Sequence, residues 1–594
     1  MNFSAWSIKN PVPAVLLFVL LTLGGLYSFK AMKVQNFPDM DLPTVTVTAA
    51  LPGAAPAQME GEVARKLENA LAPLQGLKNL YTKVQDGTVA ITAEFRLEKP
   101  VQEAVDDVRS AIQGVRADLP ADLRDPIVSK LNVSGSPMLA YTIRSAQLDD
   151  EALSWFVDYT VARKLLGVRG VGSVARVGGV TRQVEVALDP LRLQALGTTA
   201  ADISRQLQQV QTESTGGRAD LGQGEQPLRL LATVQNVDEL ARLELMLSNG
   251  QRIRLSDVAQ VRDTVAEPRA LALLNGQPVV GFEVARSKGA SEVEVGAAVQ
   301  AALAELKAQR PDLEITEAFN FVQPVAEEFS ASMHLLYEGA LLAVIVVWLF
   351  LRDGRATLVS AVALPLSVIP TFIGMAWLGF SLNVVTLLAL SLVIGVLVDD
   401  AIVEVENIER HIRMGKTAYQ AAMEAADEIG LAVIATTFTL VAVFLPTAFM
   451  SGIAGQFFKQ FGWTAALAVL ASLLVARLLT PMMAAYLMRP LKRAHRDPFW
   501  MPAYLRASRW TLNHRWITLG LAGAFFVGSV LLIPLLPQGF VPPDDNSQTQ
   551  VFIELPPGAT LAQTHDAAEA ARLRVAAVPQ VSDIYTTIGG GAAG

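Results

Sequence analysis

The stretch at residues 382–405, LNVVTLLALSLVIGVLVDDAIVEV, decides how the chain is organised. It is apolar and long enough to cross a bilayer as a helix, yet Asp399, Asp400 and Glu404 lie inside it. A rise of about 1.5 Å per residue puts the aspartates about 25 Å from its start, within a hydrocarbon core of roughly 30 Å. The sequence therefore predicts a membrane-spanning helix that carries acids.

Acids at this depth require an explanation, because an ionised carboxylate there costs at least about 2.5 kcal/mol. Either the acids are protonated for part of the time, or cations from another helix pair with them. Asp400 and Glu404, four residues apart, share one side of the helix. We favour a proton or cation relay through Asp399 and Asp400 over a static ion pair between helices. Three further residues are candidates for assisting this relay: Glu404, Glu406 and Arg477. The alternative for Arg477 is that it pairs two helices or that its charged end snorkels to the membrane surface.

The composition supports a membrane protein. Of 594 residues, 52% are hydrophobic and 18% charged, and the net charge of −8 argues against a nucleic-acid binder. The absence of cysteine excludes disulfides and cysteine nucleophiles. The sequence has no P-loop, no nucleophile-elbow motif and no histidines at metal-ligand spacing. We therefore expect a protein that is not an enzyme and that uses neither a metal nor another cofactor.

Apolar runs predict seven membrane-spanning helices, at 12–29, 335–351, 358–380, 382–405, 431–450, 463–488 and 517–536. The Lys- and Arg-rich connections at 352–355, 410–416 and 489–515 are expected on the cytoplasmic side. Residues 31–328 and the chain after 536 then lie outside, which in a bacterium is the periplasm. The basic segment 489–516 is either an amphipathic helix on the inner leaflet or a solvated linker.

In the outer segment, hydrophobic residues recur with the spacing of a strand in some stretches and with the spacing of a helix in others. Residues 31–134 are predicted to form a split βαβ, ferredoxin-like unit. Its strands are expected at 44–49, 79–84, 89–95 and 127–133 and its helices at 56–74 and 101–119. A second unit covers 135–190 and 271–328, with strands at 138–144, 173–177, 182–188, 279–284 and 313–318 and helices at 151–166 and 293–307. Residues 191–270 form an inserted module. Its polar, glycine-rich stretch is either a projecting arm or a flexible surface loop, and it includes Gly216, Gly217, Arg218, Gly222 and Gly224.

The pattern around the first helix recurs after the seventh. NFPD at 36–39, the strand at 44–49 and LPGA at 51–54 correspond to GFVPPD at 539–544, a strand at 549–554 and LPPGA at 555–559, followed by a helix from Leu561. The helix at 1–30 is therefore expected to be a permanent span, and 537–594 to begin a second outer domain. We interpret the sequence as a truncated half-transporter or a fragment of a longer gene.

The segment GVLVDDAIVEVENIER at 395–410, the outer insertion after the first helix and its restart after the seventh resemble the resistance-nodulation-division (RND) pumps. The resemblance is strongest to the hydrophobe/amphiphile multidrug efflux branch of the AcrB type. It implies an α-helical membrane bundle, at 331–488 and 517–536 besides the first helix, with α/β periplasmic porter and docking subdomains. Asp399 and Asp400 match the proton-relay aspartates of the family. The implied activity is proton-driven export of hydrophobic or amphiphilic compounds.

The resemblance also implies partners and a substrate pocket. A homotrimer or heterotrimer in the bacterial inner membrane would work with a periplasmic adaptor protein and an outer-membrane channel, with the arm reaching a neighbouring protomer. Pro137 and Val177 stand where drug exporters carry pocket phenylalanines, whereas Phe319 and Phe321 match an aromatic pair near the pocket. Two alternatives stay open: a partial subunit with an assembly role only, and lipid-type transport by the same superfamily. The heavy-metal branch is less favoured, because its motif has one aspartate where this chain has two.

Overall fold

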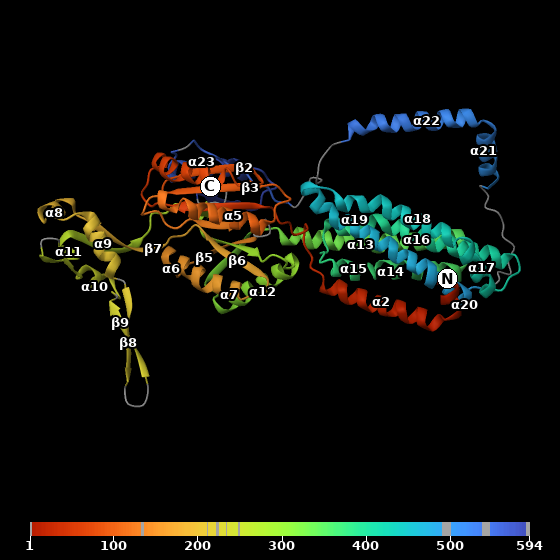
Figure 1. Ribbon diagram of the computed structural model, residues 1–594, viewed down its shortest axis with the longest axis horizontal. Coiled ribbons are helices and arrows are strands. Elements are labelled where there is room, and N and C mark those ends of the chain that lie inside the picture. The colour runs from red at the N-terminus through yellow and green to blue at the C-terminus, as the bar shows by residue number, and fades with distance from the viewer. Residues whose placement is uncertain are drawn as a thin grey trace. The chain divides into compact units, whose positions relative to one another are not determined.

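The computed structural model describes residues 3–131, 136–210, 212–220, 225–232, 234–247, 250–489, 501–536, 547–556 and 558–589. The chain divides into two compact units. Unit 1 comprises Met1–Val133 and Gln323–Gln550, and unit 2 comprises Ser134–Val322 and Val551–Gly594. Figure 1 labels many of the helices and strands of both.

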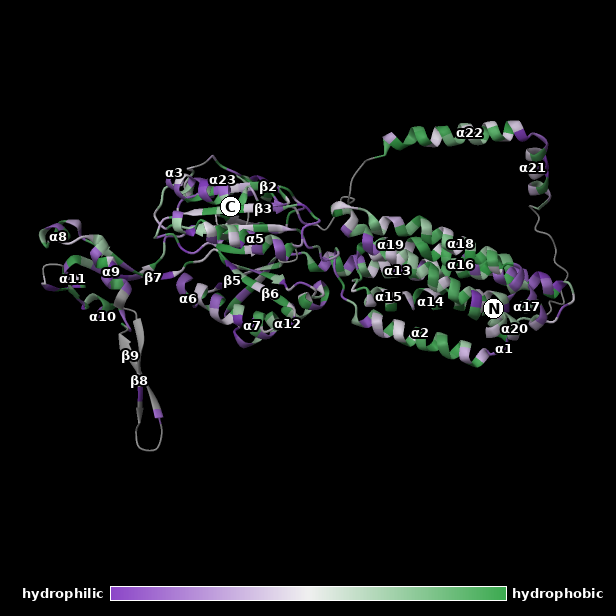
Figure 2. Ribbon diagram, in the orientation of Figure 1, coloured by the Kyte–Doolittle hydropathy of each residue, from purple (hydrophilic) through white to green (hydrophobic). Residues whose placement is uncertain are grey.

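Among the described residues, seven helices are long and apolar enough to cross a membrane, and they coincide with the seven predicted runs. They are Pro11–Ala31, Val322–Leu351, Gly354–Trp377, Val384–Arg413, Gly430–Phe449, Gly452–Leu487 and Arg515–Leu535. Figure 2 shows hydrophobic residues along most of their length. The prediction of a multi-span helical membrane protein is therefore confirmed.

The elements that build these spans, and the short helices between them, belong to unit 1. They are α1 (Phe3–Lys9), α2 (Pro11–Ala31), α13 (Val322–Leu351), α14 (Gly354–Val368), α15 (Thr371–Trp377), α16 (Val384–Arg413), α17 (Ala418–Glu428), α18 (Gly430–Phe444), η5 (Leu445–Phe449), α19 (Gly452–Leu474), η6 (Val475–Leu479), α20 (Thr480–Leu487), α21 (Met501–Asn513), α22 (Arg515–Leu532) and η7 (Ile533–Leu535). The helix α21 falls within the basic segment for which an amphipathic helix was one of two expectations.

The span predicted at 463–488 begins earlier than expected. Its first helix, α19, starts at Gly452 and so includes residues 452–461 as well. The reason is packing: Phe457 is 9% exposed, and its ring meets that of Phe37 at 5.5 Å between centroids. Further along, η6 is a π-helical turn just before Pro481, which has no N–H to continue the regular hydrogen-bond ladder.

Unit 1 also contains a four-stranded sheet with the order β2-β3-β1-β4, in which each pair is antiparallel. Its elements are β1 (Thr44–Ala50), α3 (Pro56–Met59), η1 (Glu60–Ala64), α4 (Arg65–Leu71), β2 (Leu77–Gln85), β3 (Thr88–Phe95), α5 (Val101–Gly114), η2 (Arg116–Asp118) and β4 (Ile127–Lys130). The helix expected to reach residue 74 ends at Leu71: Ala72 still has helical dihedral angles, but Pro73 has no N–H to continue the hydrogen-bond ladder. The helix expected to reach 119 ends at Gly114.

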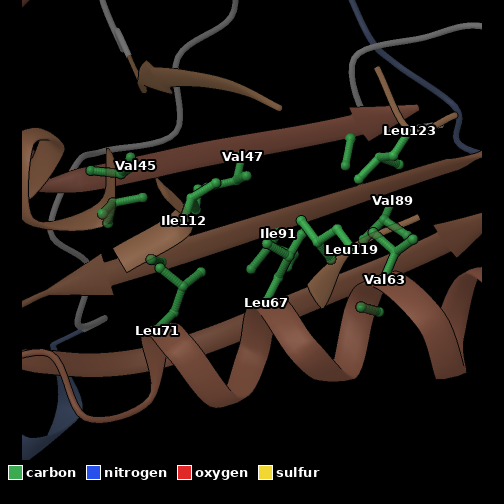
Figure 3. Packing of buried hydrophobic residues seen from close by; sticks show 14 of the residues in the cluster. Val45, Val47, Val63, Leu67, Leu71, Val89, Ile91, Ile112, Leu119 and Leu123 are labelled. Atoms are coloured by element: carbon green, nitrogen blue, oxygen red, sulfur yellow. The ribbon is translucent and has the colours of Figure 1, made fainter. Parts of the chain in front are cut away.

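Alternate residues of β1 and β3 point to one face of this sheet, where the helices cover them. Val45, Val47 and Ile91 are fully buried there, as are Leu67 and Leu71 of α4. Figure 3 shows the leucines of the helix pointing into the strands. The strict period-two burial of β3 is what made these strands predictable.

Unit 2 is built on a second four-stranded sheet, with the order β16-β5-β15-β6 and antiparallel pairs. Its elements are β5 (Pro137–Ser145), α6 (Asp150–Phe156), η4 (Val157–Val161), α7 (Ala162–Leu166), β6 (Val171–Val177), β15 (Val280–Arg286), α12 (Glu292–Gln309) and β16 (Leu313–Asn320). One sheet face packs on the helices through Phe282, Leu139 and Ile143.

The inserted module follows β7 (Arg182–Leu188). Its elements are α8 (Pro190–Ala195), α9 (Ala200–Val210), β8 (Thr212–Asp220), β9 (Glu225–Ala232), α10 (Val237–Ala241), β10 (Glu244–Met246), β11 (Arg252–Arg254), α11 (Leu255–Val258) and β12 (Ala259–Val265). The strand at 182–188 was expected in the second sheet, but β7 pairs instead with β12. A period-two pattern reports which face is buried and does not identify the partner strand.

The last segment of unit 2 contains α23 (Leu561–Ala576), as predicted, and β17 (Tyr585–Ile588). β17 pairs with β13 (Leu271–Leu274), which also pairs with β14 (Gln277–Pro278). Residues 549–554 were expected as a strand and are not one. A strand is held by its neighbours' hydrogen bonds, and no described strand pairs with this segment as β3 and β4 pair with β1.

Candidate functional site

The helix that carries the acids has a well-defined start. Asn383 accepts hydrogen bonds from the amides of Val385 and Thr386, each at 3.0 Å, and its own amide donates to Thr386 Oγ1 at 3.0 Å. This capping box satisfies amides that have no partner inside the helix. From there α16 runs for 30 residues to Arg413, so its acids keep regular helical spacing.

The three acids differ in burial. Asp399 is exposed, Asp400 is half-buried and Glu404 is 0% exposed. Neighbouring helix residues point about 100° apart, which explains why Asp399 and Asp400 have different surroundings. Ser472 Oγ of α19 donates to the Leu397 carbonyl at 3.1 Å and lies 3.4 Å from Asp400 Oδ2. The fold thus turns Asp400 and Glu404 toward the packed side of α16.

Glu404 is the most enclosed of these acids, and neither of its carboxylate oxygens has a hydrogen-bond partner among the described residues. Arg477, in η6, interacts electrostatically with Glu404, but its Nη1 donates to the Ala426 carbonyl at 2.7 Å. Gly430 makes room for this arginine, since a Cβ there would come within 2.8 Å of Arg477 Cζ. An enclosed carboxylate without hydrogen bonds is costly in its charged form, which suits a group that binds protons.

Two further observations concern the relay residues that were proposed from the sequence. Glu406 is exposed and lies two residues from Glu404, so α16 turns it away from the packed side. Ser472 was not singled out from the sequence, because a serine within an apolar span gives no sign of its partner. Within the described ranges, no group of three His, Asp or Glu side chains could hold a metal ion.

The four substrate-pocket candidates all belong to the second sheet or its edge. Pro137 pairs with Ala285 and Val177 with Gly281, so they flank β15 from opposite sides, roughly 13 Å apart along the strand. The rings of Phe319 and Phe321 are 5.2 Å apart between centroids and inclined by 48°. The Phe321 amide donates to the Met138 carbonyl, which places this aromatic pair beside the first residues of β5.

The predicted arm is a β-hairpin where the structure describes it. Gly216, Gly217 and Arg218 lie in β8, which pairs with β9 and changes register between Thr215 and Arg218. Arg218 also forms an exposed salt bridge with Glu225, at 3.3 Å. Gly222 and Gly224 lie outside the described residues.

The chain matches the model of the AcrB/AcrD/AcrF family over residues 3–594. It is 32% identical over 566 residues to a protein described as "Multidrug resistance protein MdtC" from Pectobacterium carotovorum subsp. carotovorum (strain PC1), a match that covers 93% of this chain and 55% of the relative. The chain thus spans about half the length of this curated relative. The family match agrees with the sequence motif at 395–410, and the chain belongs to the AcrB/AcrD/AcrF family of RND permeases.

Proposed function

We propose that the chain is part of a proton-driven antiporter that exports hydrophobic or amphiphilic compounds across the bacterial inner membrane. The observation that carries this proposal is the pair Asp400 and Glu404 on the packed side of a spanning helix, with Glu404 fully buried and unpartnered. Membership of a family of multidrug permeases supplies the transported class. Acids inside a span that titrate during turnover couple cargo movement to proton entry.

The proposed proton path follows α16. Lys and Arg at 410–416 put the end of α16 on the cytoplasmic side and its start at Asn383 on the outer side. Asp399 and Asp400 receive protons first, and Glu404, about one turn further on, accepts them on the way inward. Arg477 balances the charge of Glu404 when the acid is ionised. We leave Glu406 out of this path because it is exposed.

The proposal extends to architecture and partners. The sheet orders β2-β3-β1-β4 and β16-β5-β15-β6 are those of split βαβ units, which supports two porter subdomains on the periplasmic side. Residues 191–270 would be the docking subdomain, and the β8–β9 hairpin its contact with a neighbouring protomer. A trimer would then pass cargo to a periplasmic adaptor and an outer-membrane channel.

The test is made in the full-length permease. Asp399→Asn and Asp400→Asn, at unchanged expression, should abolish dye efflux from energised cells and proton uptake into proteoliposomes. Glu404→Gln should slow both by roughly a hundredfold or more, the contribution of one positioned acid–base group. Glu406→Gln is the matched control, with the same charge on the same helix, and should leave both unchanged. Full export by the two aspartate variants would refute the proposal.

A further inference from the structure

Polar side chains continue along one side of α16 beyond the acids of the proposed proton path. Asp400, Glu404, Asn407 and His411 are spaced by four, three and four residues, so they lie within about 60° of one another around the helix axis. Glu404, Asn407 and His411 are all buried, with exposed fractions of 0%, 8% and 7%. This polar stripe leads from the acids to the end of α16 that is expected on the cytoplasmic side.

The helix α17 packs against this end of α16 and adds polar contacts to the stripe. Asn407 Nδ2 donates to the Ala425 carbonyl at 3.2 Å, and the Asn407 side chain also forms a hydrogen bond with Glu428. One turn further along α16, His411 Nε2 lies 2.8 Å from Oε2 of the same glutamate. The seam between the two helices is therefore polar from Asn407 to its cytoplasmic end.

The contacts of His411 define which of its ring nitrogens can take up a proton. Lys416 Nζ lies 2.9 Å from Nδ1. Because the lysine ammonium can only donate, Nδ1 accepts with its lone pair, and Nε2–H donates to Glu428. Lys416 has a second partner, since its Nζ also donates to Glu424. Lys416 can therefore leave Nδ1 to an incoming proton and keep its ion pair with Glu424.

The charges around His411 allow a proton to be held and released. Glu428 lies 2.8 Å from Nε2 and Glu424 lies 3.7 Å from Nδ1, so an imidazolium would have two carboxylates nearby. The hydrogen bond from Lys416 lowers the pKa of Glu424, and those from His411 and Arg410 lower the pKa of Glu428 to about 2. Both carboxylates are thus ionised at neutral pH. Arg410 and Lys416 balance them, which prevents the cluster from trapping the proton.

The other elements that pack on α16 add few charges at this level. The helix α20 has no charged residue. Arg355 of α14 and Arg477 of η6 donate to backbone carbonyls, those of Leu487 and Ala426. The groups that decide the charge of His411 are therefore those of α17, Lys416 and Arg410.

We propose that His411 is the group through which protons leave the path of the exporter for the cytoplasm. A proton released by Glu404 adds to the Nδ1 lone pair as Lys416 turns to Glu424, and Glu428 stabilises the imidazolium. The same proton then leaves Nδ1 for cytoplasmic water, which restores the neutral ring with its Nε2–H. Imidazole suits this role because it ordinarily gains and loses a proton between about pH 5 and pH 8.

The inference rests on the proposed function and adds an exit group to its proton path. The helix rise between Glu404 and His411 is about 10 Å, so water along the seam carries the proton from one to the other. The structural alternative is that His411 only fastens α17 to α16. The two roles differ in what can replace the histidine.

The test measures proton uptake and dye export by the full-length permease in proteoliposomes, at equal proton gradients. His411→Ala should slow both roughly a hundredfold, the contribution of one positioned acid–base group. Added imidazole should restore much of the rate. Pyrazole, a ring of the same size that is a much weaker base, should not. The matched control is His514→Ala, which removes an exposed histidine of the following cytoplasmic segment and should leave transport unchanged with or without imidazole.

A second variant separates proton transfer from packing. His411→Gln keeps an N–H donor for Glu428 but has no basic nitrogen, so it should transport as slowly as His411→Ala. The proposal is overturned if His411→Gln transports at the wild-type rate, or if imidazole and pyrazole act alike on folded His411→Ala. If His411→Ala does not fold, His411→Gln decides alone.

The same measurements distinguish this inference from the proposed function. Inactive Asp400→Asn together with fully active His411→Gln would leave the antiporter intact and remove only the exit group. Full export by Asp399→Asn and Asp400→Asn would refute both.

Discussion

His411 Nε2 of α16 lies 2.8 Å from Glu428 Oε2 at the end of α17. On its other side, Lys416 Nζ lies 2.9 Å from His411 Nδ1. Because lysine can only donate, Nδ1 is the acceptor and Nε2–H donates to Glu428. Arg410 adds a 2.7 Å hydrogen bond to the same carboxylate. These contacts join the end of α16, the helix of the proposed proton path, to α17.

Glu428→Gln should lower thermal stability in a pH-dependent way. The hydrogen bonds from His411 and Arg410 lower the pKa of Glu428 to about 2. A carboxyl whose pKa is depressed in the folded state stabilises the fold above its unfolded value of about 4.3, and this contribution is lost as pH falls toward 2. The variant should therefore melt below the wild type at pH 7, and the gap should close below about pH 4.

The control for this experiment is Asp122→Asn, which neutralises an exposed acid outside the cluster. Its melting temperature should follow the wild type at every pH. A gap between Glu428→Gln and wild type that widened on acidification would contradict the assigned hydrogen bonds.

Gly25→Ala should destabilise the packing of α2. A Cβ at Gly25 would clash with the carbonyl oxygen of Ile369 and lie 2.8 Å from its carbonyl carbon, and backbone atoms cannot move aside cheaply. We expect a loss of about 1–3 kcal/mol, the usual cost of overpacking. Gly24→Ala is the control, because its Cβ would meet only the flexible tip of Ile373, at 3.2 Å. Melting of both variants in detergent tests this, and equal melting temperatures would contradict it.

Leu67→Ala should loosen the first sheet. Leu67 is 0% exposed among the strands and helices of this core, and such truncations cost about 2–5 kcal/mol. Hydrogen exchange of the β1 and β3 amides should speed up, whereas Asn69→Ala, at an exposed position of α4, should leave it unchanged. Unchanged protection in Leu67→Ala would show that this cluster does not hold the sheet.

Sequence patterns predicted those features that depend on local composition. Long apolar runs identified the spans, and period-two alternation identified β1 and β3, because each pattern reports contact with lipid or with one buried face. The pairing partners of individual strands were not predictable from the sequence. β7 was expected in the second sheet and pairs with β12, and residues 549–554 were expected as a strand and do not form one. Such pairing depends on segments distant in sequence.

The amino-acid sequence by itself determined that this chain spans a membrane and places acids within a span, because hydropathy and helical spacing follow from residue type alone. Only the tertiary structure decided which acid is enclosed: Glu404, rather than Glu406, faces the packed side of α16. It likewise decided that the imidazole of His411 lies between Lys416 and the carboxylate of Glu428. Burial and pairing are properties of neighbours brought together by folding, and the neighbours in both cases come from other segments of the chain.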